Sequence, residues 1–192
     1  MRRPYEPERK NFLELNEALH ALDALVDEPV PIRAIGGYAL AYHGIRPDEA
    51  LTADIDTATP TYSKAVRDAM RVVAKQFGLE PDWINNDVVF TMTDEVTWDD
   101  VAYHDELIEA CYEPCDLGFE HIDLRIADVE TLATSKGYAC EVSAVIRGDK
   151  DLRDLLAIAE HEGCATFDEL TRRFPTLKPM SLRRVREIMD RR

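Results

Sequence analysis

Two adjacent glycines, Gly36 and Gly37, follow a short apolar run at Ile32–Ile35 and precede residues 38–43, which suit one or two helical turns ending at Gly44. This order predicts a strand that turns sharply into a short helix. Glycines at such a turn leave backbone N–H groups open to close approach by a ligand. The helix that starts there adds the positive end of its dipole, which favours phosphate. The plainer interpretation is a simple strand-to-helix turn.

Two aspartates come 17 residues after the glycine pair. Residues 52–58 alternate as a strand does, which puts Asp54 and Asp56 on one face. Paired carboxylates bind hard cations such as Mg²⁺, or Mn²⁺, and such metals bridge to substrate phosphates. A D-x-D pair on a strand is more often a solvated surface. Its position behind a glycine turn instead favours chemistry on a nucleotide.

The remaining periodicity indicates an α+β (α/β) fold with a small mixed sheet flanked by helices and a helical C-terminal third. Further strands are expected at Val88–Phe90 and residues 119–126. Expected helices are residues 6–26, 61–77, 99–112, 128–146, 150–161, 167–173 and 181–190. We expect one domain over residues 1–165, which includes the N-terminal helix, and a basic helical extension over residues 166–192.

The segment from Gly36 to Asp56 resembles the signature of the polymerase-β-like nucleotidyltransferase superfamily, and more narrowly the AbiEii-like toxin nucleotidyltransferases. That group has a glycine pair, a His-Gly, an Arg, a Thr and an Asp-Ile-Asp in this order, followed later by a helical Lys, an Arg and a basic-Asp pair with a further Asp. The matching residues here are Gly36-Gly37, His43-Gly44, Arg46, Thr52, Asp54-Ile55-Asp56, Lys136, Arg147, Lys150-Asp151 and Asp154. The resemblance spans about residues 30–160.

The resemblance implies a set of roles. Asp54 and Asp56 would be catalytic and would bind the metal, Gly36 and Gly37 would bind nucleotide phosphate, and Lys136 would neutralise triphosphate charge. Asp151 would be a further catalytic acid or base toward an acceptor hydroxyl.

Each of these roles has a structural alternative. A helix lysine such as Lys136 can be solvated, and Asp151 can be an acid favoured near a helix N-terminus. Asp154 is a lesser candidate on the face of Asp151. Asp123, on its own strand, is a possible third carboxylate that could instead pair with Arg125.

Charge is unevenly placed along the chain, whose net charge is −15. Residues 80–130 carry 16 acidic residues and one basic residue, Arg125, and the acidic segment 80–118 has no assignment. Such a body repels a polyanion unless metal or the basic residues after 170 intervene. No run approaches the roughly 18 apolar residues of a membrane span, and no secretory signal is recognisable. The expected location is the cytoplasm, with no membrane partner.

The expected function is a metal-dependent nucleotidyltransferase that moves a nucleotidyl group from an NTP to an acceptor hydroxyl. By resemblance, the specific version is a toxin of a toxin–antitoxin system that acts on tRNA, with a cognate antitoxin as partner. A small-molecule acceptor is also open. Alternatives are a catalytically silent module of the same fold that binds nucleotide or a protein partner, and a metal-dependent phosphohydrolase.

Overall fold

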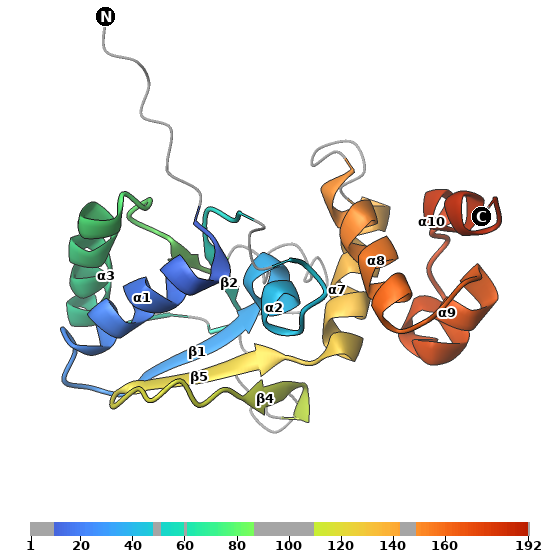
Figure 1. Cartoon of the computed structure of the whole chain (residues 1–192). Coiled ribbons are helices and arrows are strands. Elements are labelled where there is room, and N and C mark those ends of the chain that lie inside the picture. The colour runs from blue at the N-terminus through green and yellow to red at the C-terminus, as the bar shows by residue number, and fades with distance from the viewer. Residues whose placement is uncertain (1–9, 48–50, 60, 87–109, 143–148, 192) are drawn as a thin grey trace, which may run out of the picture. The chain divides into compact units, whose positions relative to one another are not determined.

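The computed structural model describes residues 10–47, 51–59, 61–86, 110–142 and 149–191 (Figure 1). The chain divides into two compact units, Met1–Ala127 and Asp128–Arg192. The described residues form a mixed α+β structure with one five-stranded sheet, which confirms the predicted fold class. The expected boundary at residue 165 lies inside the second unit rather than between the two units.

The sheet of the first unit has the order β3-β2-β1-β5-β4. Its strands are β1 (Val30–Ile35), β2 (Ile55–Thr57), β3 (Ile84–Asn85), β4 (Tyr112–Pro114) and β5 (Ile122–Ala127). The central strand β1 runs parallel to β5 and antiparallel to β2. The edge strand β3 is parallel to β2, and β4 is antiparallel to β5. The sheet is therefore mixed, as the sequence predicts.

Helices α1 (Phe12–Asp23), α2 (Gly36–Tyr42) and α3 (Lys64–Phe77) lie on one face of this sheet (Figure 1). The strand residues that alternate toward them, such as Ile32 and Leu124, are buried. On the opposite face, Asp123 is exposed and Arg33 is half-buried. One sheet face therefore belongs to the core, and the other presents polar side chains.

Helix α1 begins later than the sequence predicts. Asn11 caps it in a capping box. The Asn11 side chain accepts a hydrogen bond from the Glu14 N–H, and the Glu14 side chain accepts one from the Asn11 N–H. Lys10 instead pairs with Thr52 in an isolated antiparallel bridge, with N···O distances of 2.8 and 2.9 Å. Because Lys10 is bonded to Thr52, the predicted helix over residues 6–26 is wrong at residues 10–11. Residues 6–9 lie outside the described part.

The second unit is helical. It contains α7 (Val129–Val142), α8 (Lys150–His161), α9 (Phe167–Arg173), a short 3₁₀ helix (Pro175–Leu177) and α10 (Arg183–Met189). Its buried side chains come from all of these elements and include Leu132, Leu155, Ile158, Phe167, Leu170, Phe174, Leu177 and Val185. Residues 166–191 thus share a core with α7 and α8.

Most predicted elements are present with shifted ends. Helix α3 is capped by Ser63 and Gly78, and α7 begins after Asp128, whose Oδ1 accepts the Thr131 N–H at 2.7 Å. The strand predicted over residues 52–58 is reduced to β2. The predicted strand Val88–Phe90 lies outside the described residues, as does residue range 99–109. The helix predicted to reach residue 112 is wrong at its end, because Tyr112 begins β4.

No helix within the described ranges combines the length and the apolar character needed to cross a bilayer.

Candidate functional site

The glycine pair forms the turn that the sequence predicts. Gly36 is the first residue of α2 and has φ +73°, in the region that favours glycine. A Cβ at Gly36 would overlap with Oδ2 of Asp56. A Cβ at Gly37 would lie 3.0 Å from Nη1 of Arg46 and 3.3 Å from Oγ1 of Thr52. At both positions, any residue larger than glycine would therefore displace a neighbouring side chain.

Asp54 and Asp56 flank the buried residue Ile55, and both are half-buried. The Thr52 hydroxyl lies 3.3 Å from Oδ1 of Asp54, and Nδ2 of Asn85 lies 3.4 Å from Oδ2. Both hydrogen bonds are long, so they orient the Asp54 carboxylate without saturating its oxygens. The structure thus brings the carboxylate pair and the glycine turn together in the first unit.

The donor set fits a hard cation of the Mg²⁺ or Mn²⁺ class. Such an ion takes one or two carboxylates and completes its shell with water and substrate phosphate. Within the described ranges, no three His, Cys, Asp or Glu side chains gather as a three-ligand metal site. The residues that would hold such an ion are Asp54 and Asp56.

Asp123 does not lie beside this pair. In the parallel register of β1 and β5 it stands opposite Pro31, whereas Asp56 stands opposite Ile35. Its Oδ2 is 2.7 Å from Nη2 of Arg33, an ion pair with an exposed carboxylate. The register thus separates Asp123 from Asp56 by four residues along β1. Asp123 pairs with Arg33 and, at 3.7 Å, with Arg125, the partner that the sequence suggests.

The other expected catalytic residues form a buried cluster in the second unit. Nζ of Lys136 on α7 lies 2.7 Å from Oδ1 of Asp151 and 3.0 Å from Oδ2 of Asp154, both on α8. All three side chains are less than a tenth exposed. Burial lowers the pKa of Lys136, but Asp154 and Asp151 raise it more, so it lies above the ordinary value. Lys136 is therefore a charged, paired residue.

The environment of Lys136 differs from the one that the sequence suggests. The sequence allows a solvated lysine here, but Lys136 is buried, and a Cβ at the next residue, Gly137, would overlap with Leu177 and Met180. Gly137 is small because the turn after α9 packs against α7. Oδ2 of Asp151 is buried and has no hydrogen-bond partner among the described residues. The four expected catalytic residues thus fall into two clusters, one in each unit.

Two aromatic residues near the glycine turn have structural roles, as the sequence favours. Tyr38 is buried, its ring centroid lies 4.9 Å from that of Phe12, and its hydroxyl donates to Asn16 at 2.5 Å. Burial raises the pKa of Tyr38 well above its ordinary value. His43 Nε2 lies 2.8 Å from the carbonyl oxygen of Ala127. These contacts fix α2 against α1 and the end of β5.

Sequence reasoning missed Asn85. Its position results from the parallel pairing of β3 with β2, in which Asn85 stands opposite Asp56. A two-residue strand has no periodicity to detect, so only the sheet register reveals it. Arg46 and Thr52, which the resemblance names, do lie beside Gly37.

Comparisons of the chain with protein-family models, with curated proteins and with solved structures give no match.

Proposed function

We propose that this chain is a metal-dependent nucleotidyltransferase that uses an NTP. The observation that supports the proposal best is the fit between Asp56 and Gly36, with the half-buried Asp54 two residues before Asp56 in the chain. An aspartate with no role other than to be solvated at the surface does not require a glycine in contact with its carboxylate. A carboxylate pair next to a helix N-terminus supplies a place for a divalent ion and, beside it, backbone donors for phosphate.

In the proposed reaction, an acceptor hydroxyl oxygen attacks the α-phosphorus of the NTP. A bond forms between that oxygen and the α-phosphorus, the bond from the α-phosphorus to the bridging oxygen breaks, and pyrophosphate leaves. A bound divalent ion would supply charge neutralisation at the phosphates. Asp54 and Asp56 orient the ion, and the turn at Gly36 and Gly37 orients the phosphates. Arg46, beside Gly37, adds positive charge there.

The resemblance adds Lys136 and Asp151 to the reaction. By the resemblance, Lys136 would act as a cation toward phosphate and Asp151 as the base that accepts the hydroxyl proton, whereas the structure pairs both in the buried cluster of the second unit. The pairing of Lys136 with two acids supports a positioning role for Asp154 in the same cluster. A tRNA acceptor and a cognate antitoxin partner are part of this proposal and rest on the resemblance alone.

The first test is calorimetric titration of each NTP into the protein with Mg²⁺, for the wild type and for Asp54→Asn/Asp56→Asn. We expect saturable, magnesium-dependent binding that the double substitution weakens at least about tenfold, because charge-assisted contacts are worth about 1.5–3 kcal/mol each. Asp123→Asn is the matched control. It changes an aspartate on the same sheet that pairs with Arg33, and it should bind as the wild type does.

A second measurement identifies the reaction. NTP labelled at the α-phosphorus is incubated with total tRNA, and label that becomes covalently attached indicates nucleotidyl transfer. Release of label as nucleoside phosphate without attachment favours the phosphohydrolase alternative. Binding without either outcome favours the silent module. If no NTP binds, the proposed function is wrong.

A further inference from the structure

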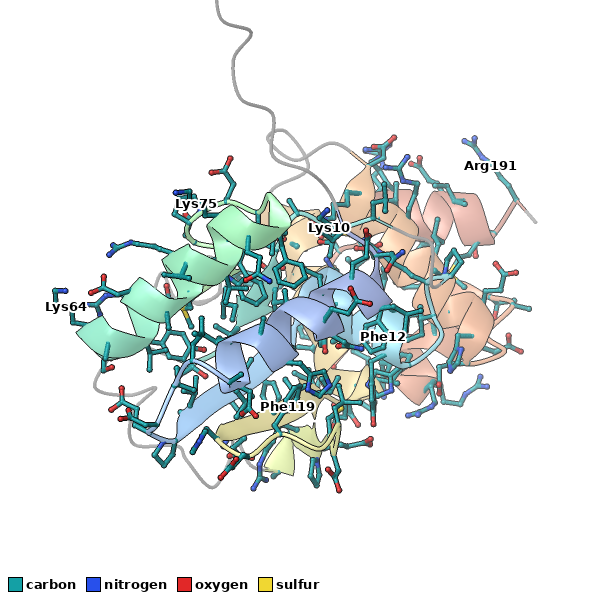
Figure 2. The ribbon with its side chains drawn as sticks, turned by 60° about the vertical axis from the view of Figure 1, so that its left-hand side comes forward. Lys10, Phe12, Lys64, Lys75, Phe119 and Arg191 are labelled. Atoms are coloured by element: carbon teal, nitrogen blue, oxygen red, sulfur yellow. The ribbon has the colours of Figure 1, made fainter. Side chains whose placement is uncertain are left out.

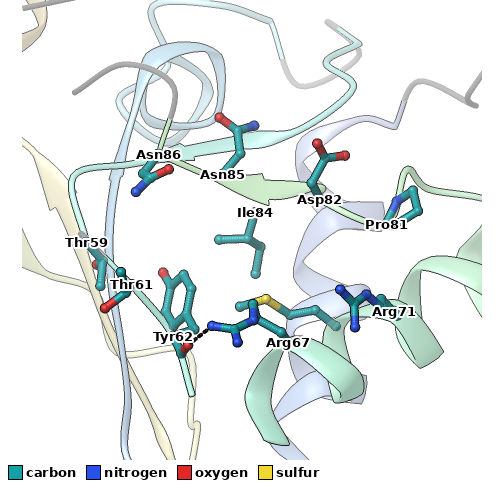
Figure 3. Close-up of a pocket in the computed structure, with 11 residues that line it drawn as sticks. Thr59, Thr61, Tyr62, Arg67, Arg71, Pro81, Asp82, Ile84, Asn85 and Asn86 are labelled. Carbon is teal, nitrogen blue, oxygen red and sulfur yellow. Dashed lines mark hydrogen bonds between the residues drawn. The ribbon is translucent and has the colours of Figure 1, made fainter. Parts of the chain in front are cut away.

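A pocket of about 690 Å³ lies in the first unit, lined by Thr59, Thr61 and Tyr62 together with residues of helix α3 and strand β3 (Figure 3). This volume falls within the range of small-molecule sites, which is roughly 300–1,000 Å³. Asn85 lines the pocket, and its amide also contacts Asp54. The pocket is otherwise built from residues that the proposed function does not use.

The floor of the pocket is apolar and aromatic. Met70 and Ile84 are buried, at 3% and 5% exposure, and both line the pocket. Figure 3 shows the Tyr62 ring and the Ile84 side chain directed into the same space. An aromatic face beside branched aliphatic surface suits a flat ring, because such surfaces bury the ring without leaving polar atoms unsatisfied.

The Tyr62 hydroxyl is a buried polar group at this floor. It lies near the Thr57 and Thr59 hydroxyls but makes no hydrogen bond of good geometry within the described part of the chain. Burial raises the pKa of Tyr62 above its ordinary value, so the phenol stays neutral and keeps its proton. The hydroxyl is therefore a neutral group covered by Thr57 and Thr59, and the Tyr62 ring is the part that the pocket offers to a ligand.

The rim carries two arginines one helical turn apart, Arg67 and Arg71 (Figure 3). Arg67 donates to the carbonyl oxygen of Tyr62, and Nη1 of Arg71 lies 2.8 Å from Oδ1 of Asp68. A guanidinium has five N–H donors, so these contacts leave donors for an anion. The planar fork matches the oxygens of phosphate. One acid, Asp82, also lines the pocket.

Two amides complete the wall. Asn85 and Asn86 follow each other at the end of β3, and both line the pocket. They add polar surface to the lining beside the apolar residues. The pocket thus combines an apolar floor, a cationic rim and amide groups, and each part matches a different portion of one kind of molecule.

We propose that this pocket binds a phosphorylated ring compound of the size of a nucleoside monophosphate. The phosphate lies at Arg67 and Arg71, and the ring lies on Tyr62 and Ile84. The inference goes beyond the proposed function, because it requires neither the carboxylate pair nor a metal ion. It stands or falls separately from nucleotidyl transfer.

The test is calorimetric titration of AMP, GMP, CMP and UMP, one at a time, into the full chain in EDTA. We expect saturable binding of at least one of them. Arg67→Gln/Arg71→Gln should weaken this binding at least about tenfold, since contacts with a charged partner are the strong ones. Asp123→Asn, which changes an aspartate of the same unit outside the pocket, should leave it unchanged.

The matched control is Lys64→Gln/Lys75→Gln, which removes two positive charges from the same helix outside the pocket. Figure 2 shows these lysines projecting outward from α3. The control should bind as the wild type does. Arg71→Gln alone, at a side chain that is 60% exposed, provides a variant that does not depend on the Arg67 contact, and it should also weaken binding.

Four results would overturn the inference. The first is that no monophosphate binds. The second is that the lysine control loses as much affinity as the arginine variants, which would indicate a diffuse charge effect. The third is loss of binding in Asp54→Asn/Asp56→Asn with the arginine variants unaffected, which would place the ligand at the carboxylate pair. Equal affinity for ribose 5-phosphate would refute the ring contact.

Discussion

Gly36 is held by two independent constraints. Its φ of +73° costs a residue with a side chain about 1 kcal/mol or more, and a Cβ would displace the Asp56 carboxylate. Gly44 has a similar φ of +69° but nothing within 4 Å of an added Cβ. Comparing the same substitution at the two glycines therefore separates the cost of backbone strain from the cost of the contact with Asp56.

We predict that Gly36→Ala lowers the free energy of unfolding by about 2–3 kcal/mol and Gly44→Ala by about 1 kcal/mol. The difference arises from the overlap with Asp56. Asp56→Ala in the Gly36→Ala background should recover that difference, because the remaining Cβ–Cβ separation of 3.4 Å is ordinary contact. Urea unfolding of the four proteins measures it. Equal losses at the two glycines would show that Asp56 does not press on Gly36.

At this scale the sequence predicted part of the candidate site. The turn at Gly36 was predicted from the sequence, whereas its contact with Asp56 results from the antiparallel pairing of β2 with β1. The contact of Asn85 with Asp54 depends on which strand pairs with β2, and no local pattern encodes this. Asp123 lies on the same face of the sheet as Asp56, as the third-carboxylate hypothesis requires. The pairing of β5 with β1 nevertheless separates the two residues along β1.

At the scale of elements, the pairing of α7 with α8 depends on a charged contact inside an apolar interface. Lys136 and its two aspartates are nearly inaccessible to water. A buried charge that loses its partner is strongly destabilising, whereas a matched apolar replacement is often neutral. The cluster therefore favours one alignment of the two helices over others.

We predict that Lys136→Met destabilises the protein by about 3–5 kcal/mol at neutral pH, because two buried carboxylates remain. Lys136→Met/Asp151→Asn/Asp154→Asn should recover most of this loss. Because the folded pKa of Lys136 lies above 10.5, its stabilisation is complete below that pH and disappears as pH rises through the folded value. Urea unfolding at pH 7 and pH 11 tests both statements. A triple variant no more stable than Lys136→Met would contradict the prediction.

Elements with strong periodicity or caps were predictable, and short ones were not. Ser63 and Gly78 bound α3, and α9 has its predicted ends because Thr166 and Glu169 form a capping box. The start of α1 was predicted too early, because the prediction followed the apolar periodicity and did not use the capping box of Asn11 with Glu14. Strand β3 has two residues, which is too short for any alternation.

At the scale of the whole molecule, the two units differ in charge. Residues 128–192 carry twelve acidic and twelve basic residues, so the net charge of −15 belongs to residues 1–127. Many basic residues of the second unit already have partners, among them Arg173 with Glu162 and Arg184 with Asp149, at 2.7 and 2.8 Å. Repulsion between acidic groups therefore concentrates in the unit that contains the carboxylate pair.

We predict that raising NaCl from about 20 mM to about 0.5 M increases the thermal midpoint of unfolding by a few degrees, because salt screens this repulsion. Glu113→Gln/Glu120→Gln, at two exposed acids of the first unit, should reduce the dependence on salt. Calorimetry of both proteins at the two salt concentrations measures the effect. A midpoint that falls with added salt would show that attractive pairs outweigh the repulsion.

The fit of Asp56 against Gly36 also has an evolutionary consequence. The two positions can change only in a certain order, since a side chain at 36 requires a shorter residue at 56 first. In lineages that keep the aspartate, position 36 should stay glycine even where neighbouring residues drift. A descendant with a larger residue at 36 should have already lost the acid at 56, and with it any metal-dependent activity. A related protein without this glycine would then be one that has lost the original activity and taken on another function.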